Sequence, residues 1–249
     1  MSIFVKSEQE IALMRLAGRI VAKVLETLKS EVRPGIRTDE LDAIAVREVG
    51  QLGATPSFKG YRGYPASICV SINDEIVHGI PGQRVLEEGD VVSIDFGAIY
   101  KGFHGDAAVT VGVGKMDPKA VILMKTTEGA LGAGIDAARA GARMGDVSNA
   151  IQQYVESRGF AVIREYTGHG IGREMHEDPQ IPNFGIPGQG TLLKKGMTFA
   201  LEPMVTNGDW RTKVGSNHWT VSTVDGSLSA HYEHSIAITD GHAQVLTAI

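Results

Sequence analysis

The same order of predicted secondary structure occurs twice along this chain, and this repetition limits the folds that it can adopt. In the first half we expect two helices, one after Ser7 up to Pro34 and one from Thr38 to Gly53, followed by strands at 67–72 and 91–114. In the second half we expect helices from 118 to about 140 and from about 146 to 158, with strands near 161–164, 198–206 and 232–239. Two helices followed by strands, twice over, predict an α/β (α+β) fold. It would have two pseudo-symmetric halves and a curved, mostly antiparallel sheet covered by helices on one side.

Local signals support these helix boundaries. Ser7 and Glu10 form a capping-box pattern, and Asp117-Pro118 is an N-cap followed by the residue preferred at the first helical position. No linker rich in proline, serine or charge separates the halves. Residues 1–249 are therefore expected to form a single catalytic domain.

Composition excludes several functional classes. The net charge is −5 and no block of like charge occurs, so neither a nucleic-acid groove nor a polybasic membrane patch is expected. The one cysteine, Cys69, excludes an intramolecular disulfide and a cysteine-rich zinc site, and favours a reducing compartment. The N-terminus lacks a signal-peptide pattern and no run of 18 apolar residues occurs, so we expect a cytoplasmic protein without a membrane span.

Two aspartates lie on the predicted hairpin at 91–114. If Tyr100 and Lys101 form its tip, residues whose numbers sum to 201 face each other, and Asp95 is then directly opposite Asp106. Two like charges about 4.5–5.5 Å apart destabilise a sheet, unless one is protonated or a cation lies between them. A register shifted by one residue would instead turn one aspartate towards solvent, and the hairpin alone does not decide between these interpretations.

Three further residues favour the cation. Glu202 lies among apolar residues of a predicted strand, and Glu233 lies at a strand start. His169 lies between glycines, in a predicted loop where the backbone can approach a ligand closely. Four carboxylates and an imidazole suit a pair of Mn, Fe, Co or Zn ions, and do not suit a thiolate-type structural zinc site.

Eight short segments, spread over nearly the whole chain, carry a resemblance to a known family. The sequence closely resembles the bacterial-type, type I methionine aminopeptidases of the peptidase M24 family. The matching segments are Gly63-Tyr64-Pro65, Ser71-Ile72-Asn73, His78-Gly79-Ile80-Pro81, Asp95-Phe96-Gly97, Gly105-Asp106, Gly168-His169-Gly170-Ile171-Gly172, Glu202-Pro203 and Tyr232-Glu233-His234.

The resemblance implies a pita-bread fold and removal of the initiator methionine, by metal-activated water, when the second residue is small. It implies two divalent ions (Co, Mn, Fe(II) or Zn), with a structural monovalent cation as a further candidate. Nascent polypeptide N-termini, met at the ribosome, would be the partners of a monomer that binds neither nucleic acid nor membrane. The implied metal ligands are Asp95, Asp106, His169, Glu202 and Glu233.

Catalytic and substrate-binding roles also follow from the resemblance. Glu202 would act as the base, His176 would hold the oxyanion, and His78 would contact the scissile amide nitrogen or relay a proton. The methionine pocket would be formed by residues that the sequence alone assigns to the core: Tyr61, Tyr64, Cys69, Met175, Trp219 and Phe58.

The chain departs from its bacterial relatives around this pocket. Phe58, Arg62, Met175 and His231 stand where cysteine, histidine, phenylalanine and glutamine are common, so the pocket's shape and its inhibitor preference do not follow from the resemblance. His234 is expected to point to the strand face opposite Glu233.

Three other classes fit less well. Proline dipeptidases, aminopeptidase P and creatinase-like enzymes carry a large N-terminal domain, for which this chain has no room. Binding modules of the same fold that have lost their metals would lack ligands that are all present here. A glycosidase using Asp95 and Asp106 as its acid pair would leave His169, Glu202 and Glu233 unexplained.

Overall fold

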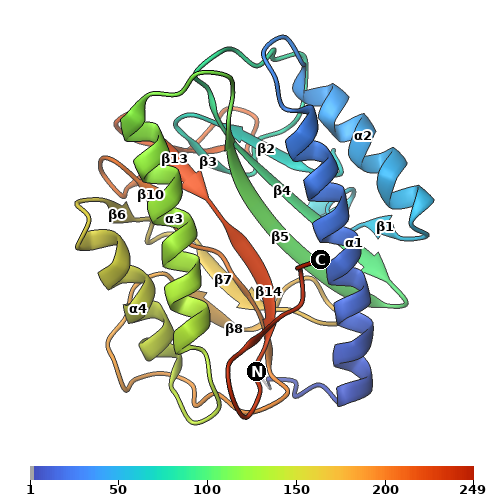
Figure 1. The fold of residues 1–249 in the computed structure, drawn as a ribbon, viewed down its shortest axis with the longest axis vertical. Coiled ribbons are helices and arrows are strands. Elements are labelled where there is room, and N and C mark those ends of the chain that lie inside the picture. Colours follow the sequence, from blue (N-terminus) through green and yellow to red (C-terminus); the bar gives the residue numbers. More distant parts are fainter. Residues whose placement is uncertain (1–2) are drawn as a thin grey trace.

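Four α-helices, arranged as two pairs, cover one side of a central sheet in a computed structural model that describes residues 3–249 (Figure 1). The Ser7 and Asp117 side chains cap their helices as predicted. The fourth helix begins earlier than predicted, because the Asp146 carboxylate accepts a hydrogen bond from Arg143 N (2.7 Å) and thus marks the third helical residue. The helices are α1 Glu8–Glu31, α2 Thr38–Gln51, α3 Pro118–Ala137 and α4 Met144–Glu156.

The central sheet has nine strands, and every pairing in it is antiparallel. Its order is β1-β4-β5-β14-β9-β7-β8, with β2 paired to β4 and β15 paired to β14. The strands are β1 Thr55–Pro56, β2 Cys69–Ile72, β4 Val91–Tyr100, β5 Phe103–Gly112, β7 Thr167–Gly170, β8 Glu177–Pro182, β9 Thr198–Leu201, β14 Glu233–Ala237 and β15 Gln244–Val245.

Two small three-stranded sheets, β13-β10-β6 and β11-β12-β3, stand beside the central one. A 3-10 turn at Tyr61–Gly63 precedes β2. No helix within residues 3–249 is long and apolar enough to cross a membrane. The strands of the small sheets are β3 Glu75–Val77, β6 Ala161–Val162, β10 Met204–Thr206, β11 Thr212–Val214, β12 Val221–Thr223 and β13 Ser229–His231.

Each helix pair packs its own hydrophobic core against the sheet. One core joins α1 and α2 to β4 through residues such as Leu28, Leu41 and Phe96, all fully buried. The other joins α3 and α4 to β9 and β14 through residues such as Ile151 and Phe199. Two equivalent cores, one for each half, confirm the predicted fold of helix pairs covering one face of a mostly antiparallel sheet (Figure 1).

The register of the β4–β5 hairpin differs from the prediction. Lys101 and Gly102 both have positive φ (50° and 78°) and form the tip, so facing residues have numbers that sum to 203. Glycine takes the tip because it adopts positive φ at little cost. The prediction that Asp95 lies directly opposite Asp106 was therefore wrong. Asp106 faces Gly97, and the two acids are diagonal neighbours on one face.

Two other segments were also predicted incorrectly. The strand expected at 198–206 is interrupted at Glu202-Pro203, because proline has no N–H to donate, and its two parts join different sheets. His169 lies inside strand β7 and not in a loop. A Cβ atom at Gly168 would stand 2.4 Å from the Ala200 carbonyl oxygen, so this glycine marks a close approach between strands.

Candidate metal centre and active site

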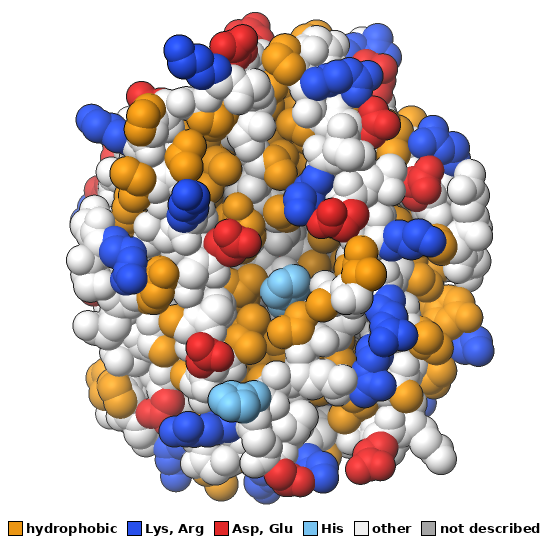
Figure 2. All heavy atoms as spheres, in the orientation of Figure 1, with side chains coloured by type: hydrophobic (Ala, Val, Ile, Leu, Met, Phe, Trp, Pro, Cys, Tyr) orange, Lys and Arg blue, Asp and Glu red, His pale blue; other side chains and the backbone are white. Residues whose placement is uncertain are grey.

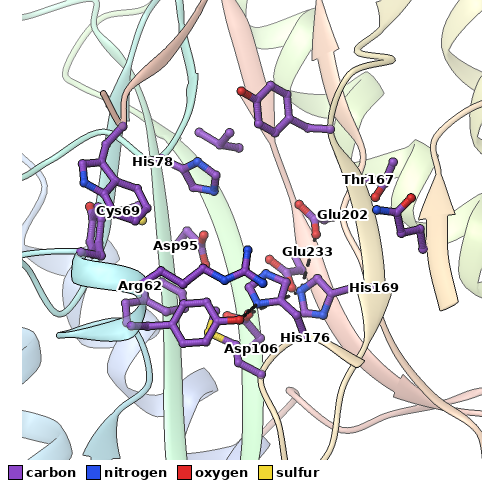
Figure 3. Close-up of a pocket in the computed structure, with 18 of the residues that line it drawn as sticks. Arg62, Cys69, His78, Asp95, Asp106, Thr167, His169, His176, Glu202 and Glu233 are labelled. Carbon is purple, nitrogen blue, oxygen red and sulfur yellow. Dashed lines mark hydrogen bonds and ion pairs between the residues drawn. The ribbon is translucent and has the colours of Figure 1, made fainter. Parts of the chain in front are cut away.

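One cavity of about 340 Å³ gathers all the residues that the sequence singled out for metal binding, catalysis and the methionine pocket. It opens on the face of the central sheet away from the helices, and Asp95, Asp106, His169, His176, Glu202 and Glu233 lie together near its centre (Figure 3). The predicted residues that line it are Phe58, Tyr61, Tyr64, Cys69, His78, Asp95, Asp106, His169, Met175, His176, Glu202, Trp219 and Glu233.

Strand register places the acids on the cavity side of the sheet. Asp95 and Glu233 both pair with Ala108, so the three side chains form one row across β4, β5 and β14. Asp106, two residues before Ala108, points to the same face. The intervening residues, such as Phe96, are buried in the core under α1 and α2. Alternation along two strands thus separates the charged cavity from the apolar core.

Glu202 and His169 approach these acids from β9 and β7. His169 Nε2 lies 3.7 Å from Glu202 Oε1 and 4.0 Å from Asp106 Oδ2. The other ring nitrogen, Nδ1, lies 2.8 Å from the Gly170 carbonyl oxygen. A carbonyl can only accept, so Nδ1 carries the proton and the Nε2 lone pair faces the carboxylates, which is the tautomer that a metal ligand requires.

The buried acids oppose their own ionisation. Burial raises the pKa of Asp106 to about 7. Burial, followed by the charges of neighbouring carboxylates, raises the pKa of Asp95 and Glu233 well above the usual range, and Glu202 behaves in the same way. Burial also lowers the pKa of His169 to about 4, which keeps its imidazole neutral. The cluster must therefore hold protons or a cation near neutral pH.

The donor atoms fit a divalent cation. Three buried carboxylate oxygens, Asp95 Oδ1, Asp106 Oδ1 and Glu233 Oε1, have no hydrogen-bond partner among residues 3–249. Asp106, His169 and Glu233 each offer one ligand atom, and these atoms lie within 4.8 Å of one another. Buried polar atoms are seldom left unsatisfied in proteins, so these oxygens are well placed to bind a metal ion.

Two histidines stand at the rim of the acidic cluster. The ring of His176 lies 4.2 Å from that of His169, and its Nδ1 lies 2.9 Å from the Tyr61 hydroxyl. Partial burial of the ring, followed by the charges of His169 and Arg62, lowers the pKa of His176. His78 has a φ of 61°, a conformation that is uncommon outside glycine and often found at functional sites.

An apolar pocket adjoins the acidic cluster. Phe58, Cys69 and Met175 are buried there, although they remain part of the cavity wall. The Tyr64 hydroxyl donates towards the Ile68 and Gly79 carbonyl oxygens, at 3.1 and 2.9 Å, and this fixes the ring. The sequence alone assigned these residues to the core, and they do form a hydrophobic cluster, but one that lines a cavity.

His231, which the sequence marked only as a departure from bacterial relatives, contacts the acidic cluster. Its Nε2 lies 3.7 Å from Glu202 Oε2, and the side chain is 2% exposed. Its position could have been predicted from the sequence, because His231 and Glu233 are two residues apart and side chains alternate between faces along an extended segment. The same rule placed His234 correctly: its Nδ1 lies 2.8 Å from the Thr247 hydroxyl, outside the cavity. His231 contacts the acidic cluster from outside the cavity lining. The lining residues without a predicted site role are Arg62, Val77, Glu165, Tyr166, Thr167 and Gln180.

Comparison with known proteins identifies the family. The sequence model of metallopeptidase family M24 matches residues 12–240. The chain belongs to metallopeptidase family M24. It is 52% identical over 247 residues to a methionine aminopeptidase of Clostridium perfringens, with 99% of each chain covered. The crystal structure of a methionine aminopeptidase from Thermotoga maritima superposes with a TM-score of 0.98 at 48% identity, and each chain is covered completely.

The same fold also occurs within a longer protein. Prolidase from Pyrococcus furiosus matches 98% of this M24 chain with a TM-score of 0.81, but at only 23% identity and over only 65% of its own length. This likeness supports the fold alone. Together the two structural matches confirm the pita-bread fold that the sequence resemblance implied.

Proposed function

We propose that this chain is a methionine aminopeptidase, which hydrolyses the first peptide bond of proteins and peptides that begin with methionine followed by a small residue. The observation that carries the proposal is the cavity, in which a buried carboxylate and imidazole cluster directly adjoins an apolar pocket with aromatic and sulfur-containing walls. The Clostridium perfringens relative, 52% identical along its whole length, bears the same activity in its name.

The proposal includes two divalent metal ions held by Asp95, Asp106, His169, Glu202 and Glu233. Such ions, when bound, acidify a water molecule and polarise the peptide carbonyl. The oxygen-rich donor set suits Co, Mn or Fe(II), and its imidazole also suits Zn. The structural monovalent cation stays a prediction.

Glu202 is proposed as the base. Its carboxylate lies 3.7 Å from His169 on one oxygen and is 14% exposed, so it borders both the metal ligands and the open part of the cavity. Burial raises its pKa, and a carboxylate of raised pKa can take a proton from water and return it to the leaving amine near neutral pH.

His176 is proposed to stabilise the oxyanion as the carbonyl is attacked. If the Tyr61 hydroxyl donates to Nδ1, the proton of the neutral imidazole resides on Nε2, where it can be donated to the substrate oxygen. His78, which also lines the cavity, is proposed to contact the amide nitrogen of the scissile bond or to relay a proton.

The apolar pocket is proposed to bind the methionine side chain. Its lining includes Phe58, Tyr61, Tyr64, Met175 and Trp219, and the last stands with its ring centre 5.1 Å from that of Tyr64, edge to face. Contacts between sulfur and aromatic rings are worth about 0.3–1.5 kcal/mol each, which favours a thioether over a branched chain. Cys69, the remaining member, lies beside Asp95 in the β2–β4 register.

The wider context stays at the level of prediction. Residues 1–249 are proposed to act as one catalytic domain and as a monomer in the cytoplasm. The proposed substrates are nascent polypeptide N-termini, met at the ribosome.

Peptide specificity tests this function. Purified protein supplied with Co²⁺ should release methionine from Met-Ala-Ser, Met-Gly-Ser and Met-Ser-Ser, and only slowly from Met-Lys-Ser or Met-Trp-Ser. We also propose that the free α-amino group of the substrate binds at the acidic end of the cavity, to a metal ion when one is present. N-acetyl-Met-Ala-Ser is the matched control, because acetylation prevents this contact. Release of N-acetylmethionine at a comparable rate would refute the proposed mode of binding.

A further inference from the structure

His231 is held rigidly beside the acidic cluster. It ends strand β13, where it pairs with Met204 of β10. The Thr110 hydroxyl donates to the His231 carbonyl oxygen (2.7 Å) and accepts from its backbone N–H (2.9 Å). These contacts fix the backbone, and the imidazole is thereby directed towards the carboxylates of the cavity.

The ring nitrogen of His231 faces two of these carboxylates. Nε2 lies 3.7 Å from Glu202 Oε2 and 3.8 Å from Glu233 Oε2, and the side chain is 2% exposed. Nε2 has no hydrogen-bond partner in the part of the chain that the structure describes. Both separations exceed the range of about 2.7–3.2 Å for a hydrogen bond.

These separations instead lie slightly above the spacing of ligand atoms that share one ion, so a side-chain movement of a few tenths of an ångström would bring the atoms to that spacing. Bonds of about 2.0–2.2 Å in a tetrahedral site place neighbouring ligand atoms roughly 3.3–3.6 Å apart. His169 Nε2 lies at the same 3.7 Å distance from the other oxygen of Glu202. The Glu202 carboxylate thus stands between two imidazoles, with one ring facing each oxygen.

Two sets of three potential ligands result, and Glu233 belongs to both. One set is Asp106, His169 and Glu233, and the other is Glu202, His231 and Glu233; within each set the ligand atoms lie within 4.8 Å of one another. Each set contains one nitrogen. An imidazole in the second set would raise its preference for Zn, Co or Fe over Mn.

We propose that His231 is a sixth protein ligand, which with Glu202 and Glu233 completes a second nitrogen-containing metal site. The inference rests on the proposed metal centre, but goes beyond its five ligands. His231 then sets the affinity of one metal site and the selectivity of that site among metals.

The test measures metal binding without substrate. Metal-free wild-type protein and the variants His231→Gln and His234→Gln are titrated with Zn²⁺ by calorimetry. Glutamine keeps the polarity and approximate length of the side chain but is a poor ligand for Zn²⁺. His234→Gln is the matched control, because its ring lies outside the cavity against Thr247. We expect His231→Gln to weaken one binding step at least about 10–100-fold, and His234→Gln to bind both ions as the wild type does.

X-ray absorption of the wild-type protein loaded with two Zn²⁺ supplies a readout that does not depend on a variant folding. Two imidazole ligands across two ions give an average of one per ion, whereas His169 alone gives one half. An average of one half, or wild-type affinity in His231→Gln, would overturn the assignment. A wild-type protein that binds no Zn²⁺, Co²⁺ or Mn²⁺ at all would instead refute the proposed metal centre itself.

Discussion

Glu202 has two proposed roles, as a metal ligand and as the catalytic base. It stands at the point where proline ends strand β9, and the Asn183 side-chain amide donates to its backbone carbonyl oxygen at 3.0 Å. Its carboxylate faces His169 and His231, one on each oxygen. Substitution of a residue that is both ligand and base should therefore reduce metal binding and turnover together. Substitution of a residue that touches only substrate should reduce turnover alone.

Comparison of Glu202→Gln with His176→Ala tests this difference. Glu202→Gln should lower kcat by about 10²–10⁴-fold through lost proton transfer and should also weaken metal binding. His176→Ala should lower kcat by about 10²–10³-fold, the usual effect of removing one oxyanion donor. Since that contact forms mainly in the transition state, KM and metal content should stay near wild type.

Kinetics and elemental analysis of both variants provide the measurement. Tyr61→Phe serves as the companion variant, because it leaves the imidazole of His176 in place and removes only the hydroxyl that stands 2.9 Å from its Nδ1. Its kcat should fall less than that of His176→Ala. Loss of metal in His176→Ala would show that His176 is a ligand. Wild-type turnover in this variant would contradict the proposed oxyanion role of His176.

The raised pKa of Asp106 should make the stability of the metal-free protein depend on pH. Its pKa rises from 3.8 to about 7 on folding, because the carboxyl is buried. Between about pH 4 and 7 the folded state holds on Asp106 a proton that the unfolded state has released, so this group lowers wild-type stability as pH rises, by about 1.4 kcal/mol per pH unit. Asp106→Asn cannot titrate, and its stability relative to wild type should rise with that slope and level off above pH 7.

Urea unfolding at pH 5, 6, 7 and 8 in the presence of a chelator measures this difference. Asp136→Asn, on the exposed surface of α3, controls for the loss of a carboxyl group. A gap between Asp106→Asn and wild type that is the same at all four pH values would contradict the account of the buried acids.

The packing of α1 on the central sheet depends on two backbones coming unusually close together. A Cβ atom added at Gly105 of β5 would stand 2.8 Å from Gly18 N and 2.9 Å from Gly18 Cα in α1. The helix therefore lies directly against the strand that carries Asp106, and its distance from the sheet is set by two glycines. Gly105 belongs to a segment that matches the family, but its sequence context does not reveal this packing role.

Gly105→Ala should push α1 away from β5. Overpacking of this kind costs about 1–3 kcal/mol, and we expect the urea midpoint to fall accordingly. Gly132→Ala, in α3, is the matched control: nothing lies within 4 Å of its added Cβ atom, and it should gain about 0.5–1 kcal/mol from better helix propensity. Equal stability of Gly105→Ala and wild type would show that this close contact does not set the distance between α1 and β5.

Sequence patterns predicted the long elements well and the short ones poorly. Helical periodicity and capping residues identified α1 to α4, since each covers several turns. Strands β3, β11 and β12 have three residues each, which is too few for alternation to be visible. The hairpin register was wrong by two positions because Tyr100-Lys101 was preferred to Lys101-Gly102 as the tip, although even offsets preserve the face and the acids still converged.

The two halves of the chain are joined at the metal centre. The first half contributes Asp95 and Asp106 from β4 and β5. The second contributes His169 from β7, Glu202 from the residue after β9, and Glu233 from β14. Pairing of β5 with β14 brings them together. The sequence could identify these five by residue type and family match. It could not identify the separations that involve His231, which depend on how the strands β13 and β14 and the end of β9 are arranged in space.

The helix-covered face of the molecule has a mixed charge. Acidic and basic side chains are interspersed over the helix-covered face, without a large area of one sign (Figure 2). This pattern agrees with a net charge of only −5. The buried acids, the imidazoles and the apolar pocket lie together in the cavity on the other side of the sheet, where we propose that substrate is recognised.

Metal dependence of methionine release is the most direct test of this account. Protein stripped with a strong chelator, and shown to be metal-free by elemental analysis, is mixed with Met-Ala-Ser and titrated with Co²⁺, Mn²⁺ or Fe²⁺ while free methionine is measured. Because every proposed ligand is a carboxylate or an imidazole, the stripped protein should release no methionine. Activity should return in proportion to the metal bound. Full activity in the verified metal-free protein would contradict the proposed mechanism.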